Sequence, residues 1–93
     1  MMSQIPINLE KSSKKEIDQE ILRAGIIAEL DAINLYEQMA ATTQNSNIRA
    51  ILIDIAKEEK THVGEFQAML LKLDSEQVAE LTAGKNEVNE LLN

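Results

Sequence analysis

The segment IAKEEKTHVGEF, residues 55–66, contains residue types that bind metal ions. In a helix, Glu59 and His62 stand one turn apart on one face, in line with apolar residues such as Ile55 and Phe66. Burial of an unpaired carboxylate is costly, so this face is expected to hold a partner for the pair. Carboxylate and imidazole together suit a hard or borderline cation such as iron or manganese.

Glu29 is a third candidate ligand and lies in the other long helical segment. At the helical rise per residue, it stands about 20 Å before the end of the expected first helix, and Glu59 stands about 18 Å after the start of the second. In an antiparallel hairpin the two carboxylates therefore meet at the same height. The sequence predicts that Glu29, Glu59 and His62 form one site.

Capping signals and periodicity predict an all-α fold built on two long helices. A capping-box pattern at Ser13 begins the first helix, which covers about residues 14–42. A polar break, TTQNSN, separates it from the second helix, at about residues 47–73, with Asn45 or Ser46 as its cap. Together they are expected to form an antiparallel hairpin.

A shorter C-terminal helix is expected after the hairpin, with Asp74 or Ser75 as its cap. Gly84 is expected to end or bend this helix. The domain organisation is then a flexible N-terminal arm, residues 1–13, and one helical domain, residues 14–93.

Composition excludes several classes of protein. The 93 residues suffice for one small domain, and the aromatic content of 2% suits a helical core better than a sheet. The net charge of −7 argues against nucleic acid and anionic lipid as partners and is compatible with attraction of cations. Without cysteine there is no disulfide framework and no thiolate metal site. No membrane-length apolar run or signal peptide is found, so the expected location is the cytoplasm.

Each long helix carries an apolar stripe interrupted near its centre by the candidate ligands. The stripe of the first helix consists of Leu22, Ile26, Glu29, Ile33, Tyr36 and Ala40, and that of the second of Ile48, Leu52, Ile55, Glu59, His62, Val63, Phe66 and Leu70. Further apolar residues flank the first stripe, namely Ile21, Leu35 and Met39. One partner helix cannot cover all of this surface, so self-association is expected.

The ligand set points to the same conclusion. A di-metal carboxylate bundle uses one Glu from each of two helices and one Glu-x-x-His from each of the other two. This chain has half of that set, and its single histidine rules out a second Glu-x-x-His in one monomer. Two hairpins related by a twofold axis would form a four-helix bundle and supply four glutamates and two histidines, which completes the set.

The segments IAELDAINLYEQMA, residues 27–40, and DIAKEEKTHVGEF, residues 54–66, resemble the half-length members of the ferritin-like superfamily. The similarity is greatest to encapsulated ferritins, with the half-rubrerythrins as near neighbours. The resemblance implies a di-iron centre, with two Fe per pair of subunits, at a subunit interface. It implies Glu29, Glu59 and His62 as iron ligands, with Glu59 bridging, and Tyr36 beside the centre as a hydrogen-bond partner of a ligand.

The resulting hypothesis is a ferroxidase-like protein that oxidises Fe(II) with oxygen or peroxide. Manganese or another divalent metal is an alternative to iron. The other functions considered are a metal-dependent assembly module without catalysis, a rubrerythrin-like peroxide reductase half and a metal-free helical interaction protein. In the metal-free case, Glu59 and His62 would be a buried hydrogen-bonded pair, and Glu29 would be a solvated or ion-paired residue.

A homodimer is the expected minimal unit, with a larger ring as an alternative. The resemblance also implies an encapsulin shell as a partner and the interior of an encapsulin nanocompartment as a location. Family members packed into such shells carry a C-terminal targeting tail, whereas this sequence closes with NELLN and shows no Gly/Leu-rich extension. The expected targeting tail is not seen in this sequence, so packing into an encapsulin shell is not supported by this feature.

Overall fold

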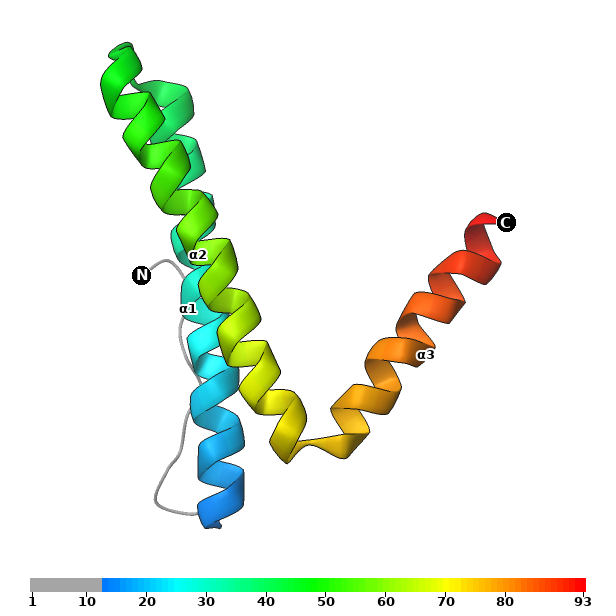
Figure 1. Ribbon diagram of the computed structural model, residues 1–93. Coiled ribbons are helices and arrows are strands. Elements are labelled where there is room, and N and C mark those ends of the chain that lie inside the picture. The colour runs from blue at the N-terminus through cyan, green and yellow to red at the C-terminus, as the bar shows by residue number, and fades with distance from the viewer. Residues whose placement is uncertain (1–12) are drawn as a thin grey trace.

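The computed structural model describes residues 13–93, which form three helices and no strand: α1 (Lys14–Thr42), α2 (Ser46–Leu73) and α3 (Ser75–Leu92). Helices α1 and α2 run antiparallel, side by side, and α3 turns away from the hairpin after α2, so that the molecule has the outline of a V (Figure 1). The predicted all-α hairpin with a third helix is confirmed. The predicted N-terminal arm lies outside the described residues, apart from Ser13.

Side-chain caps explain where the two long helices begin. The hydroxyl of Ser13 accepts a hydrogen bond from the backbone N–H of Glu16 at 3.2 Å, and the Glu16 carboxylate accepts one from the Ser13 N–H at 3.4 Å. This is the predicted capping box. Asn45 caps α2, because its side-chain oxygen accepts from the N–H groups of Asn47 and Ile48 at 2.9 and 3.1 Å. Each cap satisfies backbone donors that the helix itself leaves unpaired.

Arg49 closes the tip of the hairpin. Its guanidinium group donates hydrogen bonds to the carbonyl oxygens of Ala40 and Thr43 at 3.1 and 2.5 Å. These carbonyls lie at the C-terminal end of α1, where the last turn has no partners of its own. One side chain of α2 therefore holds the end of α1 and fixes how the two helices enter the turn.

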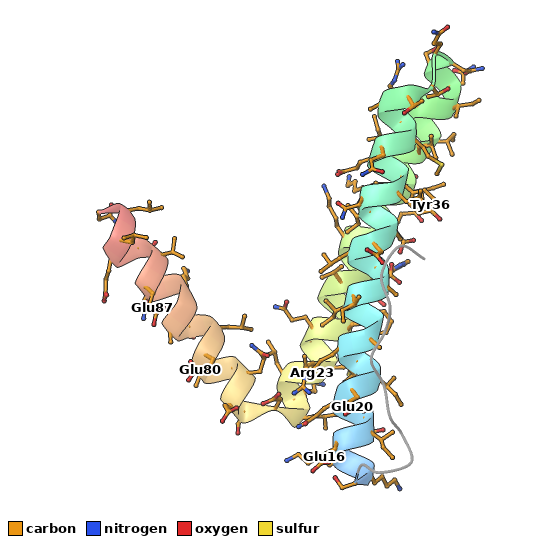
Figure 2. The ribbon with its side chains drawn as sticks, turned by 180° about the vertical axis from the view of Figure 1, so that it is seen from behind. Glu16, Glu20, Arg23, Tyr36, Glu80 and Glu87 are labelled. Atoms are coloured by element: carbon orange, nitrogen blue, oxygen red, sulfur yellow. The ribbon has the colours of Figure 1, made fainter. Side chains whose placement is uncertain are left out.

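Helix α3 is joined to the hairpin through a polar corner. The Asp74 carboxylate accepts from the backbone N–H of Gln77 at 3.0 Å and from the guanidinium of Arg23 on α1 at 2.9 Å. The hydrogen bond from Gln77 and the neighbouring Arg23 lower the pKa of Asp74 below its ordinary value. Gln19 donates to the Leu73 carbonyl at 2.8 Å. Figure 2 shows Arg23 on α1 close to this corner.

Gly84 does not end α3, so that part of the prediction is wrong. The helix continues through Gly84 to Leu92, and Gly84 does not have a positive φ. A glycine within a helix costs about 1 kcal/mol relative to alanine but keeps its backbone hydrogen bonds. The favourable residues on both sides therefore carry the helix through this position.

The core is small and lies between α1 and α2. The buried residues are Ala24, Ile33, Ala40, Ala56 and Leu70, and α3 contributes none. Of residues 13–93, thirteen large apolar side chains remain exposed, namely Ile21, Leu30, Leu35, Met39, Ile48, Ile51, Ile53, Met69, Val78, Leu81, Val88, Leu91 and Leu92. A single chain thus leaves much of its apolar surface uncovered, as the stripes predicted. Among the described residues, no helix is long and apolar enough to cross a membrane.

Candidate metal centre

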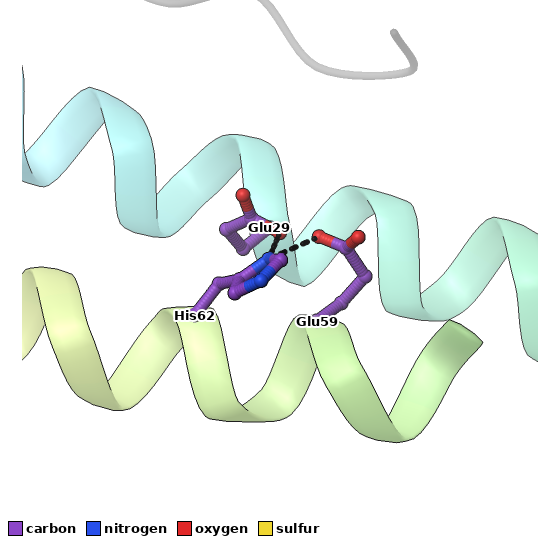
Figure 3. A group of neighbouring side chains, drawn as sticks. All are labelled: Glu29, Glu59 and His62. Atoms are coloured by element: carbon purple, nitrogen blue, oxygen red, sulfur yellow. Dashed lines mark hydrogen bonds and ion pairs between the residues drawn. The ribbon is translucent and has the colours of Figure 1, made fainter. Parts of the chain in front are cut away.

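Glu29, Glu59 and His62 meet in the middle of the hairpin, and Figure 3 shows Glu29 projecting from α1 towards the two residues on α2. The Nδ1 atom of His62 lies 3.5 Å from Oε2 of Glu29 and 3.4 Å from Oε2 of Glu59. One donor atom from each of the three residues lies within 4.8 Å of the others. The structure therefore brings together all three predicted ligands, at the matched height expected from the sequence.

The two carboxylates are more buried than the imidazole. The side chains of Glu29 and Glu59 are 19% and 18% exposed, whereas that of His62 is 42% exposed. Oε2 of Glu29 is buried and has no hydrogen-bond partner among the described groups. An unsatisfied buried oxygen typically costs about 1–3 kcal/mol. The cluster is thus closed on the hairpin side and open near His62.

Hydrogen bonding alone satisfies this cluster poorly. Both carboxylates approach the same nitrogen of His62, and both distances exceed those of well-formed N–H···O bonds. A neutral imidazole has one N–H. If Nδ1 carries that proton, two carboxylates share a single donor, and if it does not, its lone pair faces both carboxylates. Donors about 2.1 Å from a shared cation in tetrahedral arrangement would lie about 3.4 Å apart. The residues and their spacing therefore fit a bound cation.

Tyr36 forms no hydrogen bond with the residues of this cluster. It is half-buried, and it lies seven residues, or about two turns, after Glu29 on α1. Figure 2 shows Tyr36 on this helix. Its hydroxyl makes no hydrogen bond with another described residue. Its predicted role as a hydrogen-bond partner of a ligand stays a prediction.

The partner residues of two contacts beside the cluster were not identified from the sequence. Lys60 forms an exposed ion pair with Glu37 at 3.3 Å, which links the helices on the surface. The ring of Phe66 packs against the backbone of α1 at Gly25, so closely that a Cβ atom on Gly25 would lie 3.0 Å from three ring carbons. The sequence signal for this second contact is that Gly25 is the one glycine of the first long helix.

Comparison with known proteins identifies clear relatives. The sequence profile of the EncFtn-like family matches residues 5–82. The chain is 62% identical over 85 residues to a ferritin-like-encapsulin shell fusion protein of Pyrococcus furiosus, covering 91% of this chain and 25% of that protein. It is 41% identical over 69 residues to the encapsulin nanocompartment cargo protein EncC of Myxococcus xanthus, covering 71% of this chain and 53% of that protein. The chain thus spans a quarter to about half of these relatives.

The fold has a counterpart among solved structures. The crystal structure of the encapsulated ferritin domain from Pyrococcus furiosus superimposes with a TM-score of 0.84 at 59% sequence identity. The match covers 98% of this chain and 95% of that domain. The similarity therefore extends over α3 as well as over the hairpin.

Proposed function

Because the chain belongs to the EncFtn-like family and has a ferritin-like helical fold, we propose that it binds iron at Glu29, Glu59 and His62 and oxidises Fe(II) there. The observation that carries this proposal is the cluster of two largely buried carboxylates around one imidazole nitrogen. Such a donor set suits iron or manganese. The buried oxygen of Glu29, which lacks a hydrogen-bond partner, supports a cation as the missing member of the cluster.

The protein residues bind and orient the metal in this proposal. Glu29 and Glu59 would neutralise its charge from the two helices, and Nδ1 of His62 would complete the donor set of one chain. The bound iron supplies the redox chemistry, in which each Fe(II) gives one electron to oxygen or peroxide. The net charge of −7 raises the local concentration of cations around the protein.

We propose further that two chains complete the site. One hairpin supplies two carboxylates and one imidazole, half of the ligand set of a di-metal bundle. The open side at His62 leaves space for ligands from another chain. An apolar groove of about 540 Å³ runs along the tip half of the hairpin and is lined by residues that include Leu35, Met39 and Leu52. A second chain related by a twofold axis would cover this surface and would also supply the other half of the ligand set.

Association with an encapsulin shell is also part of the proposal. One relative is a fusion of a ferritin-like part with a shell, and another is a nanocompartment cargo protein. The proposed location is the interior of an encapsulin compartment.

The decisive experiment adds Fe(II) to anaerobically prepared protein and then measures oxygen or peroxide consumption. Wild-type protein is expected to consume oxidant faster than buffer, and His62→Ala protein at the buffer rate. Metal binding that increases association without faster oxidant consumption would indicate the assembly module instead. Absence of metal binding by the wild-type protein would contradict both functions.

A further inference from the structure

We propose that Gly25 and Phe66 are positioning residues that set the separation of Glu29 and His62, an inference that rests on the proposed metal function. The ring of Phe66 fills the space that a side chain at residue 25 would occupy. This contact determines how closely α2 approaches α1 beside the cluster.

The contact is unusually close. A Cβ atom on Gly25 would lie 3.0 Å from Cδ1, Cε1 and Cζ of Phe66, whereas carbon atoms in ordinary contact lie about 3.5–4.0 Å apart. A point at the same distance from three neighbouring ring atoms lies on the axis through the ring centre, so the face of the Phe66 ring covers the α1 backbone at Gly25. The other glycines, Gly64 and Gly84, have nothing within 4 Å of the corresponding position. Of the three glycines, only Gly25 lies where the absence of a side chain lets a residue of another helix approach the backbone closely.

The position of the contact links it to the cluster. Gly25 lies one turn before Glu29 on α1, and Phe66 lies one turn after His62 on α2. Four residues correspond to about 6 Å of helix rise, and residues at this spacing share a face. A shift of α2 at Phe66 therefore reaches His62 almost undiminished, because the intervening turn is rigid. Metal–ligand distances tolerate changes of only about 0.2 Å.

A methyl group at residue 25 would require several tenths of an ångström of movement. Either α2 moves away from α1, which separates His62 from Glu29, or the ring rotates outwards. Phe66 is half-buried, so rotation of the ring is the competing response. Metal affinity distinguishes the two responses, because only movement of the helix changes the donor spacing.

The test uses Co(II), whose absorption reports its coordination, as a probe of the 93-residue chain. Gly25→Ala is compared with Gly64→Ala, a matched substitution on α2 two residues from His62 where a methyl group meets no neighbour. Both changes improve helix propensity equally. We expect Gly64→Ala to bind Co(II) as the wild type does. Gly25→Ala is expected to bind Co(II) about tenfold more weakly, which is the lower end of the losses seen when residues that support metal ligands are replaced. Its helix content, measured by circular dichroism, should be unchanged.

A rescue experiment separates positioning from general damage. In the Phe66→Leu background the aromatic ring is absent, so adding Gly25→Ala should cause no further loss of Co(II) affinity. A further loss of similar size in that background would overturn the proposal. If Gly25→Ala loses helix content, the test is instead the Co(II) affinity of Phe66→Leu compared with that of the wild type. Phe66→Leu should weaken Co(II) binding severalfold in folded protein, and wild-type affinity would overturn the proposal.

The results distinguish an error in the positioning role of Gly25 and Phe66 from an error in the proposed metal binding. If the wild-type protein binds Co(II) and Gly25→Ala binds it equally well, the ring rotates outwards and only the positioning role is wrong. If the wild-type protein binds no Co(II), the proposed metal function itself is overturned, and this inference with it.

Discussion

Oε2 of Glu29 on α1 lies 3.5 Å from Nδ1 of His62 on α2, and no described group forms a hydrogen bond with this buried oxygen. The hairpin therefore holds two potential metal donors close together without satisfying one of them. Natural proteins pair most of their buried polar atoms, so an unsatisfied one calls for an explanation. A cation between the two helices is the explanation that the following predictions test.

Loss of any one candidate ligand should abolish stoichiometric iron binding and keep the helices formed. The variants are Glu29→Gln, Glu59→Gln and His62→Ala, measured by metal analysis after anaerobic Fe(II) loading and by circular dichroism. Glu58→Gln is the control, because Glu58 is exposed and adjacent to Glu59. Full iron content in one of the three variants would show that its residue is not a ligand.

Bound metal should stabilise the protein against heat. A ligand at 100 times its dissociation constant stabilises the folded state by about 2.7 kcal/mol. For a domain of this size, that corresponds to a rise in Tm of about 10 °C or more. Thermal unfolding with Mn(II), and again after chelation, measures the effect. The Glu29→Gln protein should show no rise, and an equal rise in that variant would place the bound metal elsewhere.

Replacing Leu35 with Asp should lower both subunit association and the rate of Fe(II) oxidation. Leu35 is 41% exposed and lines the apolar groove at the hairpin tip. A charge there would have to be desolvated in the proposed interface, which opposes pairing. Light scattering after size exclusion and an oxidation assay give the two readouts. Asn34→Asp, which adds the same charge at the adjacent polar position, is the control; a Leu35→Asp monomer with the wild-type rate would contradict a two-chain site.

Asp74 should stabilise the corner between α2 and α3 at neutral pH and lose this effect in acid. Its pKa is lowered by the Gln77 hydrogen bond and by Arg23, so the folded state binds a proton less readily than the unfolded state. The stabilisation is therefore complete above the ordinary pKa of Asp, about 3.9, and disappears as the pH falls through the lower folded-state pKa. Unfolding of wild-type and Asp74→Asn protein across this range measures it. The stability difference should shrink on acidification; a constant difference would mean that the carboxylate charge is irrelevant.

The sequence by itself determined the helices and the composition of the candidate site. Side chains next to the backbone set the helix starts, as the capping box at Ser13 illustrates. The spacing of Glu59 and His62 places both on one face of any helix, and the regular helical rise made the height of Glu29 calculable. The prediction that α3 ends at Gly84 was wrong, because the weak tendency of glycine to end a helix was considered without the helix-forming residues on both sides of it.

Only the tertiary structure decided how closely the helices approach and where α3 points. The contact of Phe66 with Gly25 and the ion pair of Arg23 with Asp74 join residues far apart in the sequence. Helical periodicity specifies which face a residue occupies, but it does not specify which partner fills the space opposite. That choice depends on the shapes and charges of side chains from separate helices packed together. The donor distances at His62, and the oxygen of Glu29 left without a hydrogen bond, follow from this packing.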